Sequence, residues 1–238
     1  MAKRGKRGKA RGKTRRRLGS LGMAAAVGAV VVAVVVLIVL ASTLGQDGDD
    51  VPSGLADIPP RLAPVQGNVL GSPDAPVTIV AYSDFQCPYC AQAALGTMRQ
   101  IEEEYLATGK AKLVFKYFAF EGQESIQAAQ AAECAAEQNR FWDYHDMLFL
   151  NQRIPFTNEN LKAFARELGL DTASFNFCLD LETHAEKVAA DRAEGERRGV
   201  SGTPTFYIGQ TQIVGAKPYD TFRAAIEDQL AAQQEGGG

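Results

Sequence analysis

The spacing of apolar positions changes several times along the chain, and each change marks a different predicted element. The longest apolar run covers residues 21–41 and contains no charged or strongly polar side chain. As a helix at about 1.5 Å per residue, it spans roughly 31 Å, which is close to the ~30 Å hydrocarbon core of a bilayer. The pattern therefore predicts a transmembrane anchor within residues 18–41.

Two segments rich in β-branched residues flank a segment with helical periodicity. Residues 76–82 follow a turn-like Gly-Ser-Pro-Asp and predict a buried strand. Apolar residues then recur at helical spacing from Ala91 to Tyr105, and Gly109 predicts the end of that helix. Residues 112–120 predict a second strand. Together they predict a βαβ unit with a right-handed crossover.

The middle of the chain, about residues 123–198, is predicted to be helical throughout. Two of its helices are predicted to begin at the capping residues Thr157 and Asp171. An apolar residue stands directly before each cap and another four positions after it, and the two can pack together as a hydrophobic staple. A further helix is predicted over residues 141–150.

Strand signals return near the C-terminus. Residues 203–208 and 212–214 predict a β-hairpin around a Gly-Gln-Thr turn, and a helix is predicted to follow from about Pro218. Residues 234–238 are Gly-rich and predict a disordered tail. The order of elements predicts a small α/β core with an inserted helical subdomain.

The charge of the chain is strongly segregated. Residues 1–17 hold 10 of the 25 Lys and Arg residues and no acid, whereas the rest of the chain has a net charge of −13. A basic segment can be a nucleic-acid-binding arm, but here it adjoins the apolar run. Positive charge resists translocation, so we expect a cytoplasmic N-terminus and a domain beyond residue 41 that lies outside the cytoplasm.

A cleaved signal peptide is the alternative interpretation of the N-terminal segment. Val39 and Ala41 have the small side chains of a cleavage site, and Arg15-Arg16 resembles part of a twin-arginine signal. A signal h-region is usually only about 7–15 residues long, which favours a retained anchor. Residues 42–60 are rich in Gly, Pro and Asp and predict a flexible linker, which leaves 61–233 as the folded domain.

A Cys-Pro-Tyr-Cys motif stands between the first predicted strand and the helix that follows it. Pro88 suits the first turn of a helix, so Cys87 would lie at the helix N-terminus, where backbone N–H groups favour a thiolate. The spacing places Cys90 one turn along the same face. We expect Cys87 to be an exposed nucleophile and Cys90 a shielded resolving partner.

Other uses of this motif are a zinc site, a structural disulfide or a thiolate site for copper delivery. The sequence has no second Cys-X-X-Cys and no His pair, because the other cysteines, Cys134 and Cys178, are 44 positions apart. No nearby Met or His supports copper. We therefore expect redox chemistry, with no metal and no cofactor.

Gly202-Thr-Pro-Thr precedes the late strand. A proline at a strand start can simply protect an edge. Alternatively, a cis Thr203-Pro204 bond would place this loop against the sulfurs and leave backbone groups to pair with an extended substrate.

Three stretches carry a family resemblance: Gly71-Ser-Pro-Asp-Ala-Pro-Val, Ser83-Asp-Phe-Gln-Cys-Pro-Tyr-Cys and Gly202-Thr-Pro-Thr-Phe-Tyr-Ile-Gly. Over residues 62–232 the chain resembles the DsbA-like branch of the thioredoxin superfamily. The resemblance implies a thioredoxin fold with a helical insertion, a nucleophilic Cys87, a resolving Cys90 and a cis Pro204. It also implies reoxidation by a quinone-linked membrane partner of the DsbB or vitamin-K-epoxide-reductase type.

The expected activity is oxidation of dithiols in exported proteins by thiol–disulfide exchange. The residues that tune its direction are Pro88 and Tyr89 between the cysteines and Thr203 before the proline. Pro88-Tyr89 also occurs in reducing glutaredoxin-like proteins, so a reductase or isomerase stays open. No dimerisation module is evident, and we expect a monomer.

One position departs from the family pattern. Many thioredoxin-like enzymes carry a buried acid six residues before the first active-site cysteine, where this chain has Ala81. Asp84 is expected to be a surface turn residue. The proton-transfer partner of the cysteines is therefore left open.

Several other residues have expected structural roles. Cys134 and Cys178 are expected to form a disulfide within the helical subdomain. His145 is expected to pack among aromatic residues and His184 to lie on a solvated face, neither with companions for a metal site. The acidic run 102–104 is expected to be a hydrated helix surface.

Overall fold

The computed structural model describes residues 58–236. The basic segment 1–17, the predicted anchor 18–41 and the linker up to residue 57 lie outside this range. Within the described range, no helix combines the length and the apolar character that crossing a bilayer requires.

A six-stranded mixed sheet forms the centre of the domain, in the order β1-β2-β4-β3-β5-β6. β3 and β4 are parallel, and the other neighbours are antiparallel. The strands are β1 (Val65–Gln66), β2 (Val69–Gly71), β3 (Val77–Ser83), β4 (Ala111–Tyr117), β5 (Thr205–Ile208) and β6 (Thr211–Val214).

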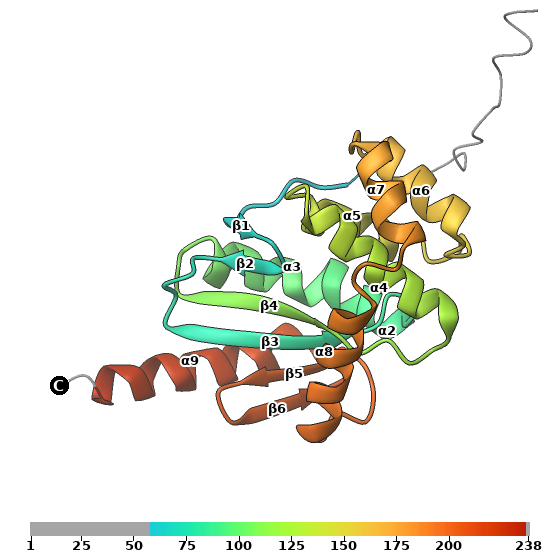
Figure 1. Ribbon diagram of the computed structural model, residues 1–238. Coiled ribbons are helices and arrows are strands. Elements are labelled where there is room, and N and C mark those ends of the chain that lie inside the picture. Colours follow the sequence, from blue (N-terminus) through green and yellow to red (C-terminus); the bar gives the residue numbers. More distant parts are fainter. Residues whose placement is uncertain (1–57, 237–238) are drawn as a thin grey trace, which may run out of the picture. The chain divides into compact units, whose positions relative to one another are not determined.

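Helices cover both faces of this sheet and form the insertion between β4 and β5. The α-helices are α2 (Pro88–Gln92), α3 (Met98–Ile101), α4 (Gln123–Ala136), α5 (Phe141–Leu150), α6 (Asn158–Glu167), α7 (Thr172–Asp180), α8 (Ala185–Arg197) and α9 (Tyr219–Gly236). α3 and α9 pack together on one face, whereas α8 crosses the other face beside β4 (Figure 1). α4 to α7 form a bundle beyond the end of the sheet that carries α2 (Figure 1). The expected α/β thioredoxin fold with a helical subdomain is confirmed.

The predicted strands are present with shifted ends, and two more strands join them. β1 and β2 are too short to show a periodic pattern, and they exist because β2 pairs with β4, with Val69 opposite Val114. β4 ends at Tyr117 rather than at residue 120, because the Phe120 and Glu121 N–H groups donate to the carboxylate of Asp84 at 2.9 and 3.1 Å and turn the chain away from the sheet.

The helix that follows β3 is not a regular α-helix. Two π-helical segments, Ala93–Thr97 and Glu102–Leu106, flank α3. π-helical turns widen a helix locally and are frequent near functional sites. The apolar spacing of this region predicted its extent correctly but not these interruptions.

Both predicted caps in the insertion are confirmed. The Thr157 hydroxyl accepts a hydrogen bond from the Asn160 N–H at 3.3 Å. The Asp171 carboxylate accepts from the Ala173 N–H at 3.0 Å. The predicted tail is partly wrong, because α9 continues to Gly236. Gln233, Gln234 and Glu235 are good helix formers and supply no stop before the glycines.

The sheet has a core on each face. The larger core lies under α2, α3, α9 and the helical bundle, and the smaller one centres on Tyr82, Phe118 and Val200. Gly195 lets α8 approach closely, since a Cβ atom there would meet Phe118 Cδ2 at 2.8 Å. Polar contacts secure the same helix, because Lys116 Nζ donates to Asp191 at 2.8 Å and to Glu194 at 3.0 Å.

A buried ion cluster joins the N-terminal segment of the domain to two helical layers. Arg61 and Arg99 both pair with Glu102, at 3.0 and 3.1 Å, and both also pair with Asp146 of α5. Glu102 additionally accepts from the Leu62 N–H at 2.7 Å. The expectation of a hydrated surface is therefore wrong for Glu102, which is buried, although the next two glutamates are exposed.

Candidate active site

Cys87 and Cys90 lie where β3 passes into α2, at one end of the sheet. Cys87 is the N-cap residue of α2 and Pro88 occupies the first turn. The Cys90 and Ala91 N–H groups donate to the carbonyl oxygen of Cys87 at 3.1 and 3.2 Å, which closes the first turn. Both thiols are free in this structure. The expected position of the motif at a strand–helix junction is thus observed.

The two sulfurs have opposite acidities. The pKa of Cys87 is lowered to about 6, chiefly because the Cys90 thiol donates a hydrogen bond to its sulfur. The Thr203 side chain and two backbone N–H groups of α2 add to this effect and together outweigh burial, which by itself raises the pKa. The pKa of Cys90 is raised far above its ordinary range, first by burial and then by the neighbouring Cys87 sulfur.

Exposure does not separate the two cysteines as expected. Cys87 is 3% exposed and Cys90 is 2% exposed, so the expectation of an exposed Cys87 is wrong. Groups from two other parts of the chain cover it. Gln152, in the turn after α5, donates to the Cys87 carbonyl at 2.9 Å, and the Thr203 carbonyl lies 3.4 Å from the Cys87 sulfur. The two thiols therefore differ in pKa because of their hydrogen bonds and their depth below the surface, and not because one residue is more exposed than the other.

The loop before β5 lies beside the sulfurs. The Thr203-Pro204 peptide bond is cis. The Thr203 carbonyl accepts from the Cys87 thiol, and the Pro204 carbonyl accepts from the Gly215 N–H at 2.8 Å. The structure thus brings together residues that are more than 110 positions apart in the sequence.

The surface around the motif is partly apolar. Tyr89, between the two cysteines, is 63% exposed, and Pro88 is also exposed. Phe120, in the loop that Asp84 holds after β4, is likewise exposed. Aromatic rings are therefore accessible close to the Cys87 sulfur.

Asp84 and Gln152 support the site, and neither role was predicted. Asp84 is buried rather than on the surface, and its carboxylate accepts from the Gln86 N–H at 2.9 Å and the Ser125 hydroxyl at 2.6 Å, as well as from the loop after β4. It therefore ties the loop before Cys87 to β4 and α4. An aspartate two residues before the N–H that it binds is an Asx-turn signal, but its distant partners left no sequence signal.

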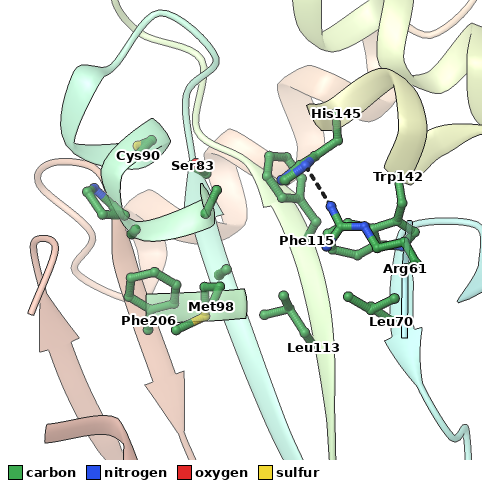
Figure 2. Close-up of a pocket in the computed structure, with 14 residues that line it drawn as sticks. Arg61, Leu70, Ser83, Cys90, Met98, Leu113, Phe115, Trp142, His145 and Phe206 are labelled. Carbon is green, nitrogen blue, oxygen red and sulfur yellow. Dashed lines mark hydrogen bonds between the residues drawn. The ribbon is translucent and has the colours of Figure 1, made fainter. Parts of the chain in front are cut away.

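A buried cavity lies under Cys90. It has a volume of about 20 Å³ and is lined by Arg61, Leu70, Ala81, Ser83, Cys90, Ala93, Ala94, Met98, Leu113, Phe115, Trp142, His145, Pro204 and Phe206. Figure 2 shows Cys90 and Ser83 on one side of it and Arg61 with Trp142 on the other. Ala81, six residues before Cys87, is part of the wall.

His145 packs among aromatic rings as expected. Its ring centroid lies 4.7 Å from that of Phe149 and 4.9 Å from that of Trp142. Burial lowers its pKa to about 4, so the imidazole is neutral near pH 7. Its Nδ1 atom lies 2.9 Å from a carboxylate oxygen of Asp146.

The second cysteine pair is joined as expected, with a disulfide between Cys134 of α4 and Cys178 of α7. His184 lies beside it, so that its ring nitrogen and the two sulfurs are within 4.8 Å of one another. Sulfurs joined in a disulfide offer no thiolate to a metal, so these neighbours do not form a ligand set in this state. The two sulfurs are bonded to each other here, and His184 pairs with Glu137 at 2.8 Å.

A family model described as thioredoxin matches residues 64–228. The chain belongs to the thioredoxin family. Disulfide bond formation protein D of Bacillus subtilis is 31% identical over 173 residues, which cover 68% of this chain and 76% of that protein. The DsbA-like resemblance is thus supported by a relative as well as by motifs.

Solved structures agree with this placement. The oxidised BdbD protein of Bacillus subtilis superposes with a TM-score of 0.65 at 28% identity, covering 71% of this chain and 99% of that one. Wolbachia pipientis alpha-DsbA1 has the same TM-score at 21% identity, covers 74% of this chain and 98% of its own, and shows the shared fold.

Longer proteins contain a similar segment. The Na(+)/H(+) antiporter NhaA 3 of Salinispora tropica is 32% identical over 189 residues, which cover 77% of this chain but 28% of the antiporter. This chain therefore spans less than a third of the length of such relatives.

Proposed function

We propose that this protein is an extracytoplasmic thiol–disulfide oxidoreductase that oxidises dithiols of exported proteins through Cys87 and Cys90. One arrangement carries the proposal: Cys87 caps the N-terminus of α2, Cys90 follows one turn along, and the cis Thr203-Pro204 loop lies beside the Cys87 sulfur. The lowered pKa of Cys87 and the raised pKa of Cys90 agree with it. Relatives that carry the name disulfide bond formation protein support it.

The site residues take the following roles in the proposed reaction. A client thiolate attacks the Cys87 sulfur of the Cys87–Cys90 disulfide, and Cys90 leaves. The second client thiol, after losing its proton, attacks the client sulfur of the mixed disulfide and releases the Cys87 thiolate. Thr203 and Pro204 hold the loop against which an extended client segment lies, and Pro88 and Tyr89 tune the potential.

The oxidising direction follows from the stabilised thiolate. An anion held by hydrogen bonds makes the reduced enzyme more stable, which makes its disulfide a stronger oxidant. The Cys90 thiol donates to Cys87 only in the reduced form, where both sulfurs are free. A reductase or isomerase of the same fold is the alternative that the test must separate.

The redox potential of the Cys87–Cys90 pair tests this direction. Equilibration of the full-length chain with glutathione buffers should yield a value toward about −120 mV, the oxidising end of the range for this chemistry. The Cys87→Ser variant is the control and should show no such transition. A value near about −270 mV would make the protein a reductase, and stoichiometric copper or zinc in the purified protein would favour metal delivery.

The proposed location and partners rest on the sequence. The basic segment 1–17 and the apolar run 21–41 support a single membrane anchor with a cytoplasmic N-terminus. A quinone-linked membrane oxidoreductase would then reoxidise the pair. Carbonate extraction of membranes that contain the full-length chain tests the anchor, because a cleaved or unanchored domain would be released.

A further inference from the structure

The cavity under Cys90 has the size and the polar lining of a water site. A buried water needs about 10–15 Å³ and two to four polar partners, and the cavity offers about 20 Å³. Most of its wall is apolar. Its polar lining includes the Cys90 sulfur, the Ser83 hydroxyl, Arg61 and His145. Figure 2 shows Cys90 and Ser83 at one side of the cavity and Arg61 at the other, with His145 beside Arg61.

Arg61 brings an unused donor to this wall. Its side chain is nine-tenths buried, and its terminal nitrogens pair with Glu102 and Asp146. Its Nε–H group has no hydrogen-bond partner among the described residues. Buried donors in proteins are nearly always paired with protein or with water, so this group points to a small ligand that accepts a hydrogen bond.

His145 supplies a matching acceptor. The Nδ1 atom of His145 lies 2.9 Å from the Asp146 carboxylate, which only accepts, and 3.4 Å from Nη2 of Arg61, which only donates. We assign the imidazole proton to Nδ1 because the contact with Asp146 is the shorter of the two. The other ring nitrogen, Nε2, then carries a lone pair. A water that accepts from Arg61 and donates to His145 keeps one further hydrogen-bonding position for Ser83.

Ser83 is next to the sulfur that must gain and lose a proton. Its hydroxyl forms a hydrogen bond with Cys90. When a client thiolate breaks the Cys87–Cys90 bond, Cys90 leaves as an anion in a buried setting and must take up one proton. When the disulfide forms again, that proton must leave. Ala81 cannot serve as the acid or base in either direction.

We propose that Ser83 and a water held by Arg61 and His145 relay a proton between solvent and the Cys90 sulfur. Cys90 thus gains its proton from solvent when the disulfide opens and returns it to solvent when the disulfide forms. This inference rests on the proposed function and names the proton path for its second sulfur. Overall, client(SH)₂ and the enzyme disulfide give client disulfide, the Cys87 thiolate, the Cys90 thiol and one released proton. Ser83 is the residue that touches the reacting sulfur, and Arg61 and His145 are positioning residues.

An aromatic disulfide, 5,5′-dithiobis(2-nitrobenzoate), tests the path in one experiment on the reduced full-length chain. The Cys87 thiolate attacks first and releases one nitrothiobenzoate. Cys90 must then lose its proton to attack the Cys87 mixed disulfide and release the second. The Ser83→Ala variant should keep the first phase and slow the second by about tenfold or more. Arg61→Lys, which keeps the charge but removes Nε–H, should also slow only the second phase.

Two variants that should keep or restore the second phase, and one control variant, distinguish a loss of proton transfer from a general structural effect. Ser83→Thr should keep the second phase fast, and Ala81→Asp added to Ser83→Ala should restore it by placing a carboxylate in the cavity. Ser72→Ala, in the loop before the opposite end of β3, should change neither phase. An unchanged second phase in Ser83→Ala or Arg61→Lys, an equal slowing of both phases, or no restoration by either variant would overturn the proposal. Absence of a second phase in the unsubstituted chain would instead refute the proposed function.

Discussion

Cys87 and Cys90 show how surroundings differentiate two identical side chains within one helical turn. Both are buried, yet hydrogen bonds stabilise the anion at Cys87, whereas depth and the neighbouring sulfur oppose it at Cys90. The first sulfur is therefore ready to attack near neutral pH, and the second keeps its proton until a partner removes it. The reaction needs this asymmetry, because only one sulfur should meet the client.

The pH dependence of alkylation measures the acidity of Cys87. Iodoacetamide reacts with the thiolate, so its rate with the reduced chain should be low in acid and rise to half its maximum at about pH 6. Cys90→Ala removes the largest source of stabilisation and should move this midpoint upward. A midpoint near the ordinary value of about 8.5 in the unsubstituted chain would contradict the assigned acidity.

At the scale of elements, the disulfide between α4 and α7 acts within the helical subdomain. It closes a sequence separation of 44 residues, and both cysteines are buried. Closing a loop of this length restricts the unfolded chain, and native disulfides typically contribute about 2–4 kcal/mol. Neither sulfur lines the cavity under Cys90. The bridge thus stabilises the subdomain without belonging to the active site.

Cys134→Ser should lower the free energy of unfolding by about 2–4 kcal/mol and leave dithiol oxidation intact. Thermal unfolding and a turnover assay on the same preparation check both outcomes. The Cys134→Ser, Cys178→Ser double variant is the control for the thiol that the single change leaves free. Lost turnover with an unchanged melting temperature would show that the second pair takes part in the reaction.

At the scale of the whole domain, four charged residues join parts of the chain that meet only in the fold. Arg61 precedes β1, Arg99 and Glu102 belong to the helix that follows the cysteines, and Asp146 lies in the insertion. Burial alone would raise the pKa of Asp146, but the His145 hydrogen bond and the two arginines hold it below its usual range. The carboxylate therefore stays charged inside the protein.

Removing one charge from this cluster should be costly. Asp146→Asn keeps the shape of the side chain but leaves the two arginines with one carboxylate between them, and breaking a buried pair typically costs about 3–5 kcal/mol. Denaturant unfolding measures the loss. Asp143→Asn, on the same helix, breaks a partly exposed pair with Arg140 and should cost no more than about 1 kcal/mol. Equal effects of the two variants would contradict a special role for the buried cluster.

The sequence alone determined the features that depend on near neighbours. Apolar spacing located the main strands and the helical insertion, the caps at Thr157 and Asp171 are satisfied within three residues, and the Cys-X-X-Cys motif marked the reactive helix start. Tertiary structure decided the features whose partners are distant. Glu102 and Asp84 are buried because donors 36 to 41 positions away bind them. Likewise, the cavity under Cys90 exists only where Arg61, β3 and α5 meet. The spacing of residues in the sequence predicts local elements. It does not show which distant groups will bind a buried charged side chain, because those groups come together only in the folded chain.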